Sequence, residues 1–168
     1  MTPRFRHVVI TVATLVLSAV PMREAHGQPS PAPPPADSRA QLTEAVGLLS
    51  GVYLYQTYLN INFLADARAG KLYDEQPARA VLGTVVGPLD AVDKHFSRLA
   101  ALAQTEADRQ AADRLRKIVG LLRRQGQELA RFWDSGHPAD GARYEATRQE
   151  SWRQISALLG LDQKPQQP

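Results

Sequence analysis

The chain of 168 residues contains no cysteine. This absence excludes disulfide bonds, haem attachment through a C-x-x-C-H motif, and anchoring through a lipid-modified N-terminal cysteine. A folded domain of this chain must therefore gain its stability from buried apolar surface, without covalent cross-links.

Histidine is scarce, and the common motifs of enzymes and metal sites are missing. Beyond the N-terminal segment the chain has only His95 and His137, and it has no E-x-x-H pair of the kind found in di-iron bundles. Asp93 lies two residues from His95, a spacing that does not bring side chains together on a helix. No P-loop or dinucleotide fingerprint occurs, and residues 47–51, GLLSG, have the wrong spacing for G-x-S-x-G. We therefore expect no metal and no cofactor, and an enzyme would need a site without a recognisable motif.

The N-terminus has the pattern of a secretory signal. A basic start is followed by an apolar run at residues 8–20 and by small residues at positions 25 and 27. The run is shorter than the about 20 residues that span a bilayer. The sequence thus predicts a signal peptide at residues 1–27 and an exported protein, periplasmic or secreted, with no integral membrane span after cleavage. Tethering by an uncleaved N-terminal segment is the alternative.

The rest of the chain predicts one folded domain between two unstructured segments. Residues 28–37, QPSPAPPPAD, are rich in proline and are expected to form an extended linker. Residues 162–168 are expected to be a disordered tail, which leaves residues 38–161 for the domain. Lysine and arginine number 20 against 17 aspartate and glutamate. Part of this excess lies in the predicted signal peptide, so the remaining charge is nearly balanced and predicts no nucleic-acid binding.

The domain begins with a predicted helix from Ser38 to about Gly70. Ser38 and Gln41 have the S-x-x-Q spacing of a capping box. The stretch YLYQTYLNINF, residues 53–63, alternates like a strand, but a continuous three-and-four spacing runs through it and favours a helix. This spacing predicts that the following residues face the core: Leu42, Ala45, Leu49, Val52, Gln56, Leu59 and Phe63.

Three further helical segments follow. The second begins near Asp74, and its apolar spacing keeps its phase across Gly87-Pro88, which predicts a kinked helix rather than two helices. The third runs from the cap at Thr105 to Gly136, and the fourth runs from about Asp140 to Gly160. Short connections make neighbouring helices antiparallel. The predicted fold is all-α, an antiparallel up-down-up-down four-helix bundle with its second helix kinked at Gly87-Pro88.

Two glutamines interrupt the apolar spacing of the first and third helices. Counting along each helix at about 1.5 Å per residue places Gln56 and Gln125 at similar heights. Pro88 cannot donate to the carbonyl of Thr84, which should lie near both amides. The sequence therefore predicts a polar layer of Gln56, Gln125 and Thr84 in the middle of the bundle. The layer either fixes the helix register or lines a small ligand cavity, unless one or both amides face water.

Two features of the predicted helix surfaces bear on binding. The third helix carries a basic flank that could contact an anionic polymer, lipid headgroups or an acidic partner, or that pairs with local acids; its candidate residues are Arg116, Lys117, Arg123 and Arg124. Tyr53, Tyr55 and Tyr58 spread around the first helix, so at least one should lie at the edge of the core.

The leading functional expectation is an exported, non-enzymatic helical protein that acts through contacts with an envelope protein or polymer. The alternatives are a bundle that binds a small ligand at the polar layer, and an enzyme with no recognisable motif.

Overall fold

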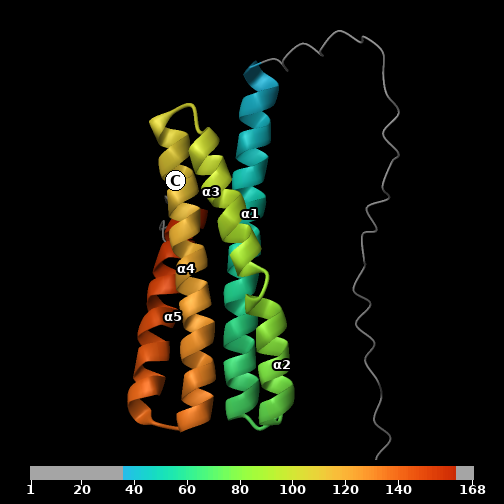
Figure 1. The fold of residues 1–168 in the computed structure, drawn as a ribbon, viewed down its shortest axis with the longest axis vertical. Helices are drawn as coiled ribbons and strands as arrows, with labels where there is room; N and C mark the ends of the chain where they lie inside the picture. Colours follow the sequence, from blue (N-terminus) through green and yellow to red (C-terminus); the bar gives the residue numbers. More distant parts are fainter. Residues whose placement is uncertain (1–35, 162–168) are drawn as a thin grey trace, which may run out of the picture. The chain divides into compact units, whose positions relative to one another are not determined.

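The computed structural model of the chain describes residues 36–161, all of which belong to one unit, residues 35–168 (Figure 1). The predicted signal peptide, the predicted tail and almost all of the predicted linker lie outside these residues. The predicted all-α class is confirmed, because every regular element in the described part is a helix. The elements are α1 (Ala36–Ala69), α2 (Glu75–Val86), α3 (Leu89–Leu102), α4 (Glu106–Ser135) and α5 (Pro138–Leu159).

Local capping explains several helix ends. The Thr105 hydroxyl accepts a hydrogen bond from the Asp108 N–H at 3.1 Å, which satisfies a free donor at the start of α4. Gly136 and Gly160 end α4 and α5 with φ of +59° and +68°, a backbone conformation that favours glycine. These three ends were predicted from the sequence and are confirmed.

Two helix starts differ from the prediction. α1 begins at Ala36, inside the predicted linker, so Ser38 lies in the first turn and is not the residue before the helix. α5 begins at Pro138, and the His137 ring accepts a hydrogen bond from the Ala139 N–H at 3.2 Å. Proline suits the first helical position because its missing N–H would be unpaired there anyway, and it starts the helix before Asp140.

Gly87 and Pro88 lie between α2 and α3, and they do not form a loop that reverses the chain. Both residues have right-handed helical backbone angles, and the Gly87 N–H still donates to the Gly83 carbonyl at 2.9 Å. The Pro88 carbonyl in turn accepts from the Ala91 N–H at 3.1 Å. α2 and α3 are therefore one joined, bent piece.

The helices pack lengthwise against one another, and α4 contacts all four others (Figure 1). Gly126 allows α2 to approach α4 closely, since a Cβ atom there would lie 2.5 Å from Val86 Cγ1. The apolar core draws on every helix; its fully buried aliphatic side chains are Leu54, Ile61, Leu89, Ile118, Val119, Leu122, Leu129 and Ile155.

The stretch YLYQTYLNINF is helical, as predicted, but the predicted buried side of α1 is wrong. The hydrophobic side chains that α1 buries are Leu54, Tyr58, Ile61, Leu64 and Ala67, whereas the predicted stripe faces outward. The error has a physical cause: residues 45–65 contain no charged side chain, so apolar residues occur on all sides of the helix. Periodicity alone cannot select a face when no charged face opposes it.

Candidate functional site

Gln125 lies in a buried polar cluster between α1, α4 and α5. Its side chain is fully buried, and its Nε2 donates to Asn62 Oδ1 at 2.9 Å. The Tyr144 hydroxyl donates to the same oxygen at 3.2 Å, so one α1 amide serves donors from two helices. The Gln125 Oε1 atom is buried and has no hydrogen-bond partner within the described part of the chain.

The predicted polar layer is not assembled as expected. Gln56 is exposed, and its Nε2 donates to Asn60 Oδ1 at 3.2 Å on the same helix. Thr84 is also exposed, and its hydroxyl donates to the Val81 carbonyl at 2.7 Å. Gln56 and Thr84 line one surface hollow of about 240 Å³ together with Pro88, but Gln125 does not line it. Counting residues fixes height along a helix and leaves the rotation open, and the rotation of α1 points Gln56 away from the core.

The environment of the cluster changes the acidity of Tyr144. Burial raises the pKa of Tyr144 to about 12, and the neighbouring Gln125 amide counteracts part of that rise. The phenol is therefore a neutral donor at ordinary pH, which suits its bond to Asn62. The hydrogen bonds of this cluster link α1, α4 and α5.

Aromatic side chains add a second contact between α1 and α5. The rings of Tyr58 and Trp152 stack with centroids 5.7 Å apart, and Tyr55 packs against the same indole at 6.1 Å. The Tyr58 hydroxyl accepts a hydrogen bond from Arg148 at 3.2 Å. Tyr53 is 38% exposed, which confirms that at least one of these tyrosines lies at the edge of the core.

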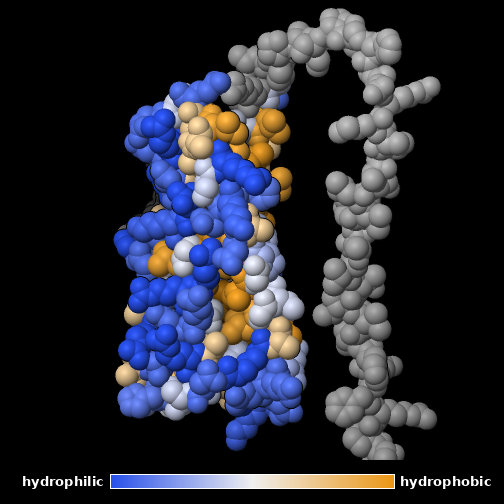
Figure 2. Space-filling model, in the orientation of Figure 1, coloured by the Kyte–Doolittle hydropathy of each residue, from blue (hydrophilic) through white to orange (hydrophobic). Residues whose placement is uncertain are grey.

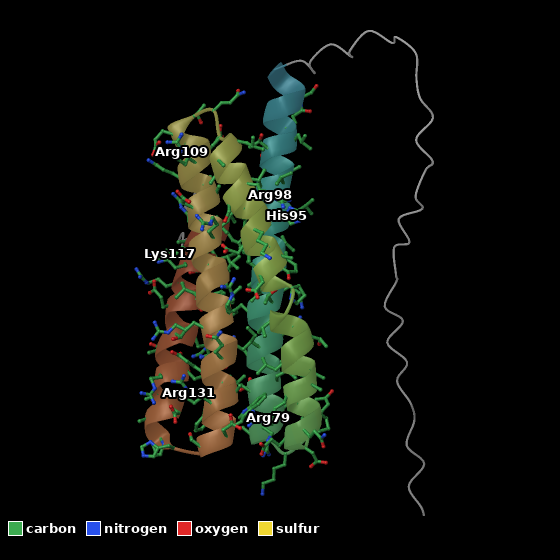
Figure 3. The ribbon with its side chains drawn as sticks, viewed as in Figure 1. Arg79, His95, Arg98, Arg109, Lys117 and Arg131 are labelled. Atoms are coloured by element: carbon green, nitrogen blue, oxygen red, sulfur yellow. The ribbon has the colours of Figure 1, made fainter. Side chains whose placement is uncertain are left out.

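Local acids pair with most of the predicted basic surface on α4. Arg116 and Arg123 reach across to α3, where they contact Asp93 at 3.4 Å and Asp90 at 2.8 Å. Arg124 contacts Glu128 of its own helix at 2.7 Å. Arg109, Lys117 and Arg131 lie at different heights of α4 and are not gathered in one place (Figure 3). The four candidate residues, Arg116, Lys117, Arg123 and Arg124, therefore do not form one unpaired cationic patch.

Two larger hollows lie along the helices. One of about 500 Å³ is lined by Phe132, Trp133 and Tyr144, with Arg68 and Lys71 at the end of α1. Arg68 Nε is buried and has no hydrogen-bond partner in the described part. The other hollow, of about 380 Å³, lies between the N-terminal half of α1 and the residues Leu115, Leu158 and Leu159.

The most unusual surface is on α1, and we call it the outer α1 face: Leu42, Ala45, Leu49, Val52, Gln56, Leu59 and Phe63. Among its large hydrophobic side chains, the three most exposed are Leu42 at 65%, Leu49 at 68% and Phe63 at 60%. Leu48 and Val46 are exposed beside it, and Figure 2 shows the hydrophobic side chains over the N-terminal half of α1. Isolated exposed leucines are normal, whereas an apolar stripe along one helix, here interrupted at Gln56, is typical of surfaces that contact other molecules.

Within residues 36–161, no group of three or more histidine, aspartate or glutamate side chains is arranged to hold a metal ion. His95 is exposed on α3, near Arg98 (Figure 3). None of the helices in the described part is both long enough and apolar enough to cross a membrane. Comparisons of the chain with protein-family models, with curated proteins and with solved structures found no match.

Proposed function

We propose that this chain is an exported, non-enzymatic helical-bundle protein that acts by binding another protein through the outer α1 face. The observation that carries the proposal is the exposure of that face. Leu42, Leu49 and Phe63 each leave more than half of their surface in water, although transferring such side chains out of water is favourable. A protein partner with a complementary apolar helix would remove this cost.

The proposal also includes the finer architecture. We take α2 and α3 as a single helix kinked at Gly87-Pro88 in an antiparallel up-down-up-down four-helix bundle. The helical backbone angles of Gly87 and Pro88 and the short connections after α1, α3 and α4 support it. This arrangement would place α1 on one side of α4 with its outer face free.

Export and removal of residues 1–27 belong to the same proposal, and the order of charge, apolar run and small residues in the sequence supports them. Intact-mass measurement of the protein purified from its host tests this point directly. A chain that begins at Gln28 is the expected result, and a chain that retains the apolar run would overturn cleavage.

Binding through the outer α1 face is tested by photo-crosslinking in cells. A photoreactive amino acid replaces Leu49 in one strain and Leu102 in a matched control, since Leu102 is 74% exposed but lies at the end of α3. We expect a protein adduct from position 49 and none from position 102. Equal labelling from the two positions, or no adduct from position 49, would refute the proposed function.

A second candidate function rests on the 500 Å³ hollow at the ends of α1 and α4. Its volume lies in the range of small-ligand sites, about 300–1,000 Å³. Aromatic walls from Phe132 and Trp133 suit an organic molecule. The charged lining is mixed, because Asp66 lies beside Arg68 and Lys71, and Arg68 also pairs with Glu75 at 3.5 Å. Native mass spectrometry of the purified protein would reveal extra mass that leaves on denaturation, and an Arg68→Ala variant should lose that mass.

A further inference from the structure

The outer α1 face has a seven-residue repeat. Leu42, Leu49, Gln56 and Phe63 are seven residues apart, and Ala45, Val52 and Leu59 lie between them. Three- and four-residue steps alternate along the whole face, which is the spacing of two helices that wind around each other with interlocking side chains. All seven residues are exposed, so this repeat has no partner in the described part of the bundle.

We propose that the occupant of this face is the same face of a second copy of the chain, in a parallel two-helix coiled coil of α1 with α1. The inference rests on the proposed function and names its partner. A two-fold axis makes an interface meet itself, so a charged face would bring like charges together. Residues 45–65 carry no charged side chain, and self-pairing of this face therefore meets no such repulsion.

Gln56 selects the parallel arrangement. In a parallel pair with matched register, each Gln56 lies opposite its counterpart, and the two amides can donate to and accept from each other. An antiparallel pair would place the amide against an apolar residue such as Val52, where its hydrogen-bonding groups would be buried without partners. A single polar residue inside a repeated apolar stripe is a known determinant of register and partner number.

The available area is sufficient for a small specific interface. The exposed large apolar residues of α1 are Leu42, Val46, Leu48, Leu49, Val52, Tyr53, Leu59 and Phe63. Five of them belong to the outer α1 face, because Leu48 and Tyr53 line hollows against other helices and Val46 lies beside the face. If each of the five buries on the order of 100 Å² in each copy, the total is on the order of 1,000 Å², which reaches the lower bound of specific interfaces.

The test uses protein purified from cells with its native N-terminus, studied by sedimentation equilibrium from micromolar to hundreds of micromolar. The wild type should have twice the chain mass. Leu49→Glu should raise the dimer dissociation constant about a hundredfold or more, because it buries an unpaired charge. The matched control Leu102→Glu should remain a dimer. Both residues are exposed, so circular dichroism should find unchanged helicity in both variants.

The register of the two α1 helices can be tested by disulfide cross-linking. Because the chain has no cysteine, a single introduced cysteine is the only thiol in each copy. A Gln56→Cys variant should form a disulfide-linked dimer on mild oxidation, and a Leu102→Cys variant should not. A monomeric wild type at every concentration would overturn self-association, and so would a dimer that Leu49→Glu leaves intact. A dimer that Gln56→Cys fails to cross-link would overturn the parallel register. If the protein is monomeric but position 49 still cross-links to a different protein in cells, the proposed function stands and the second copy does not.

Discussion

Replacing Asn62 should destabilise the protein far more than replacing the fully buried Gln125 beside it. Asn62 Oδ1 is the acceptor for two donors, Gln125 Nε2 at 2.9 Å and the Tyr144 hydroxyl at 3.2 Å. Asn62→Ala removes that acceptor and leaves both donors in the protein interior. Gln125→Leu instead removes a donor and also an oxygen that has no partner, and it leaves Asn62 paired with Tyr144.

The magnitudes follow from the cost of unpaired buried groups, about 1–3 kcal/mol each. Two stranded donors give an expected loss of roughly 2–4 kcal/mol for Asn62→Ala, because Asn62 itself is only half-buried and some water can enter. Gln125→Leu keeps the volume and replaces an imperfectly paired amide by an apolar group, so the free energy of unfolding should change by less than about 1 kcal/mol. In the double variant only the Tyr144 donor is stranded, which predicts a coupling of roughly 1–2 kcal/mol.

Urea unfolding followed by far-ultraviolet circular dichroism measures these differences, since a domain of this size is expected to unfold in one cooperative step. Gln127→Leu is the matched control. It makes the same substitution two residues further along α4 at an exposed position, where the effect should stay within about 0.5 kcal/mol. The change in unfolding free energy for Gln125→Leu, minus the change for Gln127→Leu, then gives the effect of removing the buried amide.

The opposite order of effects would refute this reasoning. If Gln125→Leu lowers the free energy of unfolding by more than about 2 kcal/mol while Asn62→Ala lowers it by less than about 1 kcal/mol, Gln125 and not Asn62 is the essential member of the cluster. Additive single effects would show that the two amides do not share a hydrogen bond.

Four other substitutions give independent checks by the same unfolding assay. Gly126→Ala should lower the free energy of unfolding by about 1–3 kcal/mol because its Cβ would meet the stiff Val86 side chain, whereas Gly120→Ala, with open space around it, should raise it by about 0.5–1 kcal/mol. Thr105→Ala should cost about 1 kcal/mol through loss of the α4 cap, and an unchanged midpoint would contradict that cap. Tyr144 binds its proton more tightly in the folded state than in the unfolded state, so stability should fall by about 2 kcal/mol as pH rises from 10 to 12; Tyr144→Phe should remove this part of the pH dependence.

The amino-acid sequence by itself determined the helical class and several helix ends, because these depend on interactions within a few residues. The Thr105 hydroxyl caps α4 through an N–H three residues away, and Gly136 and Gly160 supply the positive φ that ends a helix. The burial of Gln125 was also predicted, since it interrupts an apolar stripe on a helix whose other side is strongly charged.

The rotation of α1 was decided only by the tertiary structure. Between residues 45 and 65, apolar and uncharged polar residues occur on all sides of α1, so the local spacing allows two different stripes to face the core. The stripe with the more regular repeat is the exposed one. Contacts across the bundle choose between them: Tyr58 stacks on Trp152, and Asn62 satisfies Gln125 and Tyr144. These partners lie more than 60 residues away in the chain, so no pattern within α1 specifies them. The same choice leaves Leu42, Leu49 and Phe63 on the outside, available for a partner.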